Sequence, residues 1–389
     1  MRRVYGCLVL TAVLLLRLPA GAVGQDGGGS GLRVTLMELI DSAWTHGLDS
    51  GRYVQGRRDL QENEKPWADV AFNFLKDLRS GYGIAELVNY DGISPAFVKK
   101  EDEELTARLE KVHTEAELKE LAASFVPRSA IYDTLRAALM GVSCDTSKAR
   151  QLVAALNLYR WIHHFRWRRC IVVNIADARL SYFEQDTVRL QMRIVAGEPS
   201  KRTPRLAAWC DQLILYPYWN IPRKIAVNEF FPLFRVSPRL ADVMNIQLFD
   251  RAGKVVDPDS IRWRRWNKDN FPYSMRQSTG CDNALGVIKF NLTSPFDVYM
   301  HDTNFKIAFL RTYRWLSHGC IRLEKPVELG NLLLDHQLDT ALLQSCLKDQ
   351  KPRSIRLEEP VPVFVIYQTA VTGDSGKLRL VKDVYHLMN

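Results

Sequence analysis

The stretch that decides the interpretation of this chain is "VYMHDTNFKIAFLRTYRWLSHGCIRLEKP", residues 298–326. His301 ends a strand-like apolar run, and Cys320 follows nineteen residues later, directly after Gly319. A cysteine is a strong nucleophile only as thiolate, and its ordinary pKa of about 8.5 leaves little thiolate at neutral pH. A neighbouring imidazole can take the proton, and glycine lets a substrate approach closely. The spacing favours a nucleophile with its base, the alternative being a buried thiol and a core histidine.

The N-terminal residues carry the pattern of a secretory signal peptide. Arg2 and Arg3 precede an apolar run at 4–16, and small residues follow at 20–22. The apolar run is shorter than the ~20 residues that a membrane-spanning helix needs, which favours cleavage over retention as an anchor. We therefore expect residues 1–22 to be removed, no stable membrane span to remain, and the mature protein to reside in the periplasm or cell envelope.

Composition predicts a basic, exported protein of two units. The chain has 389 residues, 47% of them hydrophobic, which is enough for a sizeable core. Removal of residues 1–22 takes three arginines and no acids, so the formal net charge falls from +9 to +6. Anionic envelope polymers or carboxylate-bearing substrates are better partners for such a protein than nucleic acid. The cysteines are widely scattered, so we expect mostly buried thiols, with a Cys210–Cys281 pairing left open.

The first half of the mature chain is predicted to be an α-helical scaffold domain at residues 32–160, after a Gly-rich linker at 23–31. Helical spacing of apolar residues runs through four segments: residues 70–82, 101–112, 115–125 and 129–142. The half holds no dense cluster of cysteine, histidine or paired carboxylates. We therefore assign it a scaffolding or substrate-positioning role and expect no metal site.

The second half, residues 161–389, changes to short strand-like runs, beginning with "CIVVNIADARLSYFE" at residue 170. The stretch "FEQDTVRL" at 183–190 predicts a hairpin turn between two strands. A mixed segment at 223–281 interrupts the strand-rich texture and is predicted to be an insertion folded beside the site. The fold class is therefore α+β, a helical scaffold domain followed by a β-rich catalytic domain.

Two motifs together carry a family resemblance. "HDT" at 301–303 and "SHGCIR" at 317–322 resemble the signature of L,D-transpeptidases with a YkuD-type catalytic domain, enzymes that cross-link bacterial peptidoglycan. Further segments are similar in the same order: "MRIVAGEPSKRTP", "YPYWNIPRKIA", "NALGVIKF" and "EKPVELGNLLL". The resemblance runs from about Leu158 to the C-terminus and matches the large periplasmic branch, in which the segment at 223–281 corresponds to a capping subdomain.

The resemblance implies a role for each residue of the motifs. Cys320 would be the acylated nucleophile and His301 the base, its ring oriented by the backbone carbonyl of Asp302. His318 and Gly319 would shape the oxyanion region. The remaining candidates would support the loop, bind a substrate carboxylate or line the substrate groove: Ser317, Arg322, Tyr299, Trp219 and Asn220. For Tyr299, Trp219 and Asn220, a packed aromatic or a turn amide is an equal alternative.

The expected reaction is formation of 3-3 cross-links from a tetrapeptide donor stem without metal or cofactor, with carbapenems as possible inhibitors. Two departures from the family stand out: Asn304 occupies a position that is commonly proline, and residues 126–158 leave no room for an inserted peptidoglycan-binding module. An L,D-carboxypeptidase or cross-link hydrolase would use the same cysteine and histidine. A wall-binding protein with a dead site is disfavoured by the intact pair. A papain-like protease is disfavoured because its histidine follows its cysteine.

Overall fold

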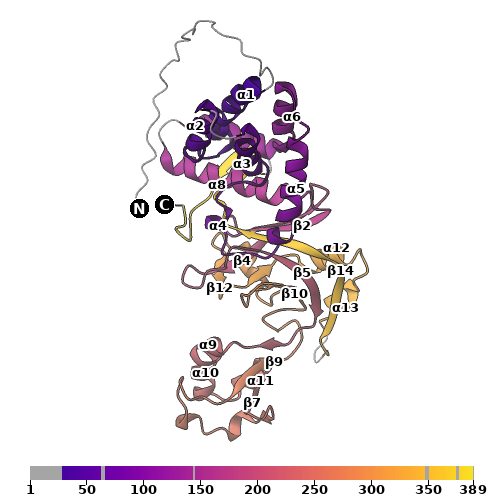
Figure 1. The fold of residues 1–389 in the computed structure, drawn as a ribbon. Coiled ribbons are helices and arrows are strands. Elements are labelled where there is room, and N and C mark those ends of the chain that lie inside the picture. The colour runs from indigo at the N-terminus through magenta and orange to yellow at the C-terminus, as the bar shows by residue number, and fades with distance from the viewer. Residues whose placement is uncertain (1–28, 63–65, 143–144, 347–349, 374–375, 389) are drawn as a thin grey trace, which may run out of the picture. The chain divides into compact units, whose positions relative to one another are not determined.

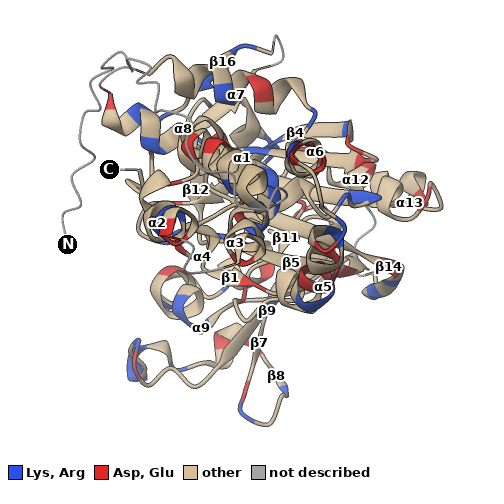
Figure 2. Cartoon of the chain, turned by 45° about the horizontal axis from the view of Figure 1, so that its top comes forward, with Lys and Arg blue, Asp and Glu red and all other residues tan. Residues whose placement is uncertain are grey.

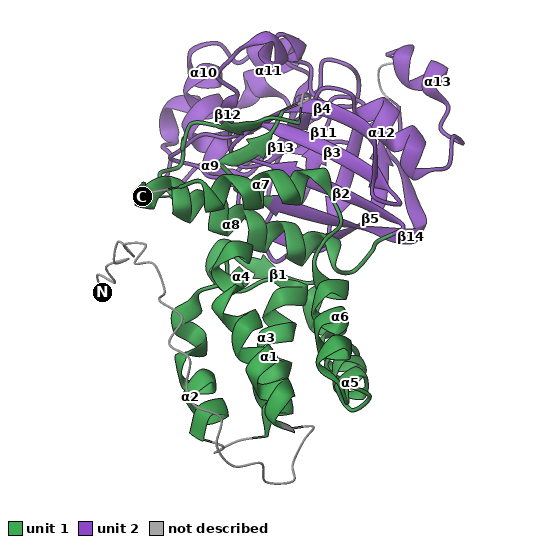
Figure 3. Ribbon diagram, turned by 90° about the horizontal axis from the view of Figure 1, so that it is seen from above, with its two compact units in different colours: residues 1–167, 366–389 green, residues 168–365 purple. Residues whose placement is uncertain are grey.

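The computed structural model describes residues 29–62, 66–142, 145–346, 350–373 and 376–388. The chain divides into two compact units, one comprising residues 1–167 with 366–389 and the other residues 168–365 (Figure 3). The predicted boundary at 160/161 is too early, because α8 (Thr146–His163) continues past it. The predicted assignment of the whole C-terminus to the catalytic domain is also wrong, since Ala370 packs in a cluster with Tyr132 of the helical unit.

The helical unit confirms the predicted periodic segments. They form α3 (Trp67–Ser80), α5 (Val98–Leu109), α6 (Glu115–Phe125) and α7 (Ala130–Met140). The other helices are α1 (Gly29–Asp41), α2 (Val54–Glu62), α4 (Ile84–Leu87) and α8. Because α1 begins at Gly29, the predicted linker at 23–31 is too long at its end. The rest of that linker and the predicted signal peptide at 1–22 lie outside the described residues.

Local sequence explains where these helices begin. Thr114 and Glu117 form a capping box at the start of α6, and Ser129 caps α7. An apolar cluster fills much of the interior, and α1, α3 and α6 contribute Leu36, Phe74 and Leu118 to it. Figure 2 shows acidic and basic residues interspersed on α5, where i,i+4 pairs of lysine and glutamate are exposed. Within the acidic run at 101–104, Glu103 and Glu104 are exposed, whereas Glu101 and Asp102 are partly buried and pair with Arg79 of α3.

The catalytic unit is built on a closed sheet. Its strands are β2 (Arg169–Asn174), β3 (Arg179–Glu184), β4 (Thr187–Gly197), β5 (Leu206–Leu215), β10 (Ile288–Leu292), β11 (Met300–His301), β12 (Trp315–Ser317), β13 (Ile321–Leu323) and β14 (Arg353–Ile366). Their order is β5-β10-β11-β13-β4-β3-β2-β14, and β14 also pairs with β5 (Figure 1). The short helices α12 (Pro326–Leu333) and α13 (Thr340–Gln344) follow the cysteine motif.

The predicted hairpin at 183–190 joins β3 to β4. Glu184 pairs with Thr187, so Gln185 and Asp186 form a two-residue loop. Both have positive φ, 47° and 64°, as a type I′ turn requires. The turn therefore agrees with the right-handed twist of the strands that it connects, and the hairpin prediction is confirmed.

The inserted segment folds around a core of its own. It contains α9 (Arg223–Ile225), α10 (Phe231–Val236) and α11 (Leu240–Val243), with a sheet of order β6-β9-β7-β8. The strands are β6 (Trp219–Asn220), β7 (Ile246–Phe249), β8 (Val255–Val256) and β9 (Ser274–Gln277). Phe234, Trp263 and Phe271 are buried together in its core. Because β6 pairs with β9, the insertion begins at Trp219, earlier than the predicted residue 223.

Two small strands close the chain, β15 (Ala370–Thr372) and β16 (Leu378–Leu380), which pair with each other. Among the helices of the described residues, none combines the length and the apolar character that crossing a membrane requires.

Candidate active site

The parallel pairing of β11 with β13 brings the two halves of the motif together. Met300 pairs with Ile321 and His301 with Arg322, and the Ile321 N–H donates to the Tyr299 carbonyl at 3.1 Å. Alternate residues of a strand point to one face of the sheet. Tyr299 and His301 therefore share a face with Cys320 and Arg322. The eighteen residues between His301 and Cys320 are the connection that a parallel pair needs.

A third strand adds a cation to this face. In the antiparallel pairing of β10 with β11, Lys289 lies opposite His301. Directly paired residues point to the same side of a sheet. Lys289, His301 and Arg322 therefore form one row across three strands. The Lys289 Nζ lies 4.0 Å from the centre of the Tyr299 ring, which ties it to the neighbouring row that contains Cys320.

The loop before the cysteine is held by its own side chains. Gly319 has a φ of 122°, a conformation that side-chain-bearing residues rarely adopt. The Ser317 hydroxyl donates to the Cys320 carbonyl at 2.6 Å and accepts from the Gly319 N–H at 3.1 Å. Ser317 thus bridges both sides of the glycine, and the Gly319 N–H is already engaged inside the loop.

Sequence reasoning missed Thr203 as a support of this loop. Thr203 is almost fully buried, and its hydroxyl donates to the Gly319 carbonyl at 2.8 Å while accepting from the Gly197 N–H at 2.9 Å. β12 also pairs with β4, placing Ser317 opposite Gly197. The only signal in the sequence was that Thr203 stands in one of the segments that carry the family resemblance.

The Cys320 thiol is partly buried and protonated at rest. Its Sγ donates to the Asp297 carbonyl at 3.7 Å. Burial raises the pKa of the Cys320 thiol, while the contact with Tyr299 and the charges of Lys289 and Arg322 oppose that rise. In the described part of the chain, no hydrogen bond joins Cys320 directly to His301 in this resting arrangement. The thiol therefore needs a base before it can attack.

His301 has the tautomer and the protonation state that a general base requires. Its Nδ1 lies within hydrogen-bonding distance of the Asp302 carbonyl, which can only accept. Nδ1 therefore carries the proton and Nε2 keeps a free lone pair. Burial, reinforced by the charge of Arg322, lowers the pKa of His301 to about 3 against the opposing bond to Asp302. The imidazole is thus neutral at neutral pH and able to take a proton.

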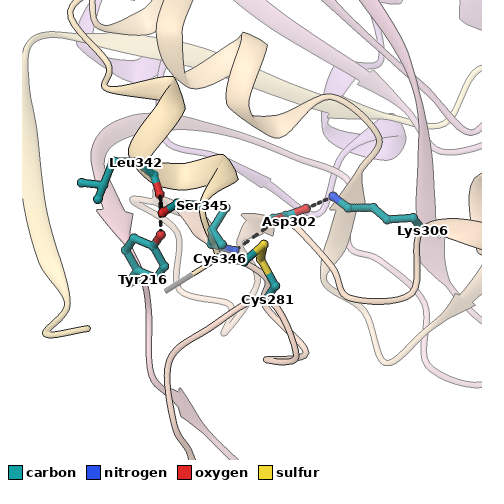
Figure 4. The surroundings of a disulfide bond; sticks show 8 residues. Tyr216, Cys281, Asp302, Lys306, Leu342, Ser345 and Cys346 are labelled. Atoms are coloured by element: carbon teal, nitrogen blue, oxygen red, sulfur yellow. Dashed lines mark hydrogen bonds and ion pairs between the residues drawn. A yellow bond between two sulfur atoms is a disulfide. The ribbon is translucent and has the colours of Figure 1, made fainter. Parts of the chain in front are cut away.

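Asp302 is fixed from several sides. Its carboxylate accepts from the Val287 N–H at 3.0 Å and pairs with Lys306, and its own N–H donates to Ile288 at 2.9 Å (Figure 4). Gly286 has a φ of 57°, and a Cβ there would lie 2.2 Å from the Asp302 carboxylate. Only glycine fits this approach. The carbonyl that orients His301 therefore belongs to a rigid residue.

A disulfide joins Cys281 to Cys346 (Figure 4). Cys170 and Cys210 are buried free thiols, so the Cys210–Cys281 pairing left open by the sequence is wrong; Cys144 lies outside the described residues. The disulfide ties the end of the insertion to the chain after α13. It also stands beside Asp282, whose carbonyl accepts from the Asn304 side chain at 2.8 Å.

His318 faces the insertion. Its Nε2 lies 2.6 Å from Oε1 of Glu229, a residue that sequence reasoning did not single out. Trp219 contributes to the core of the insertion and packs edge-on against Phe230 at 5.9 Å. Asn220 pairs with Arg276 in the sheet of the insertion and is exposed. Packing and pairing thus account for Trp219 and Asn220, whereas Glu229 provides a direct contact between the insertion and the motif.

The sequence of the catalytic unit is similar to those of known L,D-transpeptidases. A model of the L,D-transpeptidase catalytic domain family, YkuD, matches residues 168–338. A Haemophilus influenzae protein that is itself named only as a supposed L,D-transpeptidase is 34% identical over 216 residues, which is 55% of this chain and 44% of that protein. The chain therefore spans less than half the length of this relative.

Solved structures show weaker likeness. An L,D-transpeptidase from Mycobacterium smegmatis aligns at 13% identity and a TM-score of 0.23, covering 51% of this chain and 58% of its own. The catalytic domain of an Enterococcus faecium L,D-transpeptidase aligns at 16% identity and a TM-score of 0.22, covering 51% and 96%. Superpositions at this level carry no argument. The family match shows that residues 168–338 form a YkuD-type L,D-transpeptidase catalytic domain, and it defines the class of that domain.

Proposed function

We propose that this protein is a peptidoglycan L,D-transpeptidase that forms 3-3 cross-links by cysteine acyl transfer. The observation that carries the proposal is the pairing of β11 with β13, which sets a neutral, buried His301 beside Cys320 on one face of the sheet. A neutral imidazole with a free Nε2 and a protonated thiol are the two partners that general-base activation requires.

In the first half-reaction, His301 Nε2 takes the thiol proton and Cys320 Sγ attacks a carbonyl of the tetrapeptide donor. That carbonyl joins the L-centre of the diamino acid at position three to the D-alanine at position four. The tetrahedral intermediate collapses as the imidazolium returns its proton to the departing amine. D-Alanine leaves, and the donor remains on Cys320 as a thioester.

The oxyanion needs donors that the loop has not already used. The Gly319 N–H donates to Ser317 and the Ile321 N–H donates to Tyr299. We therefore assign the Cys320 N–H and the Tyr299 hydroxyl as oxyanion donors, with Gly319 providing the backbone shape. Burial raises the pKa of Tyr299, so its hydroxyl keeps its proton and remains a donor.

In the second half-reaction, the side-chain amine of a neighbouring stem attacks the thioester and gives its proton to His301. The C–S bond breaks and the Cys320 thiol re-forms. Water or a free D-amino acid in the place of that amine gives trimming or exchange instead, so an L,D-carboxypeptidase or cross-link hydrolase would use the same residues. The acceptor alone separates these activities.

Carbapenems are proposed as inhibitors of the same site. Two relatives were solved with such drugs, one in complex with imipenem and one acylated by ertapenem. The strained ring of a carbapenem presents a carbonyl to the same nucleophile and oxyanion donors. Intact-protein mass should rise by one drug adduct in the wild type and not in Cys320→Ala. An adduct that persists in Cys320→Ala would place acylation elsewhere.

The decisive experiment uses purified protein and disaccharides that carry tetrapeptide stems. Mass spectrometry of the products should show dimers joined through two residues at position three, together with released D-alanine. Tripeptides alone would make the protein an L,D-carboxypeptidase, and unchanged substrate would overturn the proposed function. Such a substrate implies export to the cell envelope, which cell fractionation would test.

A further inference from the structure

Two cations stand beside the nucleophile without a counter-charge. Lys289 and Arg322 flank His301 in one row of the sheet and are both partly buried. In the described part of the chain neither forms an ion pair, and the Arg322 Nε is buried without a hydrogen-bond partner. Burial lowers the pKa of both side chains. Desolvated, unpaired cations are costly, so their presence calls for an anion.

The nearby acids are committed elsewhere. The Asp302 carboxylate pairs with Lys306 and accepts from Val287 N. Glu324, two residues after Arg322, accepts from the Arg193 N–H and Nε, both at 2.9 Å. Asp297 is exposed, and its contact with the site is through its carbonyl. The Cys320 thiol does not neutralise the cations either, because it is protonated at rest.

We propose that Lys289 and Arg322 form a carboxylate-binding subsite that holds the terminal carboxylate of the donor's leaving residue, an assignment that rests on the proposed function. A carboxylate one residue beyond the scissile carbonyl lies within about 3.6 Å of chain length from it. Arg322 stands two residues from Cys320 on the same strand face, about 6.6 Å along the chain. The face of the Tyr299 ring holds the Lys289 ammonium toward the same place.

The subsite gives Lys289 a role that Arg322 alone does not supply. A guanidinium binds a carboxylate through paired N–H groups, whereas an ammonium acts as a point charge. With both present, the leaving residue is held by its carboxylate at the row of Lys289, His301 and Arg322, next to the row that contains the thiol. Lys289, twelve residues before His301, then strengthens the preference for donors with a free terminal carboxylate.

The test measures protection of Cys320 from alkylation by iodoacetamide, which needs no turnover. The probes are an N-acylated dipeptide that ends in D-alanine and the same dipeptide with its terminal carboxylate amidated. In the wild type, the free carboxylate should protect Cys320 at concentrations about 10-fold lower than the amide does, as for a hydrogen bond between charged groups. Lys289→Met should reduce the difference several-fold, because only Arg322 then holds the carboxylate, and Lys289→Arg should restore most of it.

The control Lys254→Met removes the same charge from an exposed turn of the insertion and should leave the preference unchanged. Equal protection by acid and amide in the wild type overturns the subsite, as does a preference of the same size in Lys289→Met and the wild type. A third probe has a diamino acid before the D-alanine. The second carboxylate of that diamino acid is amidated, and the terminal carboxylate of the D-alanine stays free. Loss of protection with this probe, but not with the terminal amide, would assign the cations to the diamino acid and overturn the assignment to the leaving residue.

The same proteins are then given complete tetrapeptide donors. If the subsite fails while thioester still forms, the proposed function stands without it. If carboxylate-selective protection is seen while no acyl-enzyme forms, the proposed function fails and the anion site remains. An effect of Lys289→Met that is equal for both dipeptides, together with a shifted pH profile of alkylation, would mean that Lys289 acts on the thiol instead.

Discussion

The helical and catalytic units each bury a histidine whose pKa is lowered to about 3, but the two histidines have different roles. His46 bonds the Tyr132 hydroxyl through Nδ1 at 3.2 Å, and Arg160 donates to both the His46 carbonyl and the Tyr132 hydroxyl at 2.6 Å. His301 keeps Nε2 free beside a nucleophile. A shifted pKa therefore identifies burial in both units, and only the surroundings separate a structural histidine from a reactive one.

The cations repeat this contrast. In the helical unit, Arg52 pairs with Asp77 at 2.7 Å, and the same carboxylate accepts from the Tyr53 hydroxyl at 2.8 Å. On the catalytic face, Lys289 and Arg322 have no such partner among the described residues. The charge of Arg52 is neutralised by a carboxylate of its own unit, whereas Lys289 and Arg322 can each bind the carboxylate of a ligand.

The largest expected effect is that of Cys320→Ala, which removes the thiol and leaves the loop contacts of Ser317 in place. Acyl transfer should fall below detection because the other free thiols of the described residues, Cys170 and Cys210, are buried. Cross-linked product and melting temperature are measured on the same preparation. Cross-linking near the wild-type rate with an unchanged melting temperature would remove Cys320 from the mechanism.

Replacing each buried histidine by alanine turns the comparison into an experiment. His301→Ala should slow acylation by about 10²- to 10⁴-fold, the usual contribution of a general base. His46→Ala should instead lower the free energy of unfolding by about 1–3 kcal/mol through the lost Tyr132 contact. The rate of acylation per folded molecule of His46→Ala should equal that of the wild type. The comparison breaks if His46→Ala slows acylation as strongly as His301→Ala does.

Acid should destabilise the protein through both histidines. Above pH 6.5 neither the folded nor the unfolded state protonates these histidines, so they do not reduce the free energy of unfolding. As pH falls from 6.5 toward 3, the unfolded state binds protons that the folded state refuses, and the free energy of unfolding decreases by at most about 1.4 kcal/mol per pH unit for each group. Urea unfolding at pH 7 and pH 5 measures this. Identical pH slopes for wild type and His46→Ala would contradict it.

The smallest expected effect concerns the contact between Glu229 and His318. A polar contact between two exposed side chains contributes about 0–1 kcal/mol, so Glu229→Gln should leave acylation nearly intact. If the insertion shields the thioester from water, the ratio of cross-linked to hydrolysed product should fall by a few-fold. Glu328→Gln, on an exposed face of α12, is the control. Equal product ratios in both variants would make the contact irrelevant to acceptor choice.

The sequence predicted the elements that depend on local pattern better than it predicted contacts between residues far apart in the chain. Apolar spacing located α3, α5, α6 and α7, and the "HDT" and "SHGCIR" motifs brought attention to the two strands that meet. Residues joined across the chain escaped notice: Thr203 and Gly319 are 116 positions apart, and His318 and Glu229 are 89 apart. The sequence contains no local sign of such contacts, which depend on strand order and on the fold of the insertion.

The prediction of the cysteine pairing failed for a similar reason. Cys281 and Cys346 are separated by 65 residues and their spacing resembles no known framework, so several pairings were open. The early boundary at 160/161 came from reading the change in texture as the end of a helix. The C-terminal residues were assigned to the wrong unit because their strand character does not indicate which unit they join.

The measurement that tests the central claim most directly is intact-protein mass spectrometry of the enzyme mixed with a tetrapeptide donor in the absence of an acceptor amine. We expect an adduct equal to the donor minus D-alanine, which peptide mapping places on Cys320, and no adduct in Cys320→Ala. Cross-linked product formed without any adduct on Cys320, or an adduct on another residue, would contradict the account.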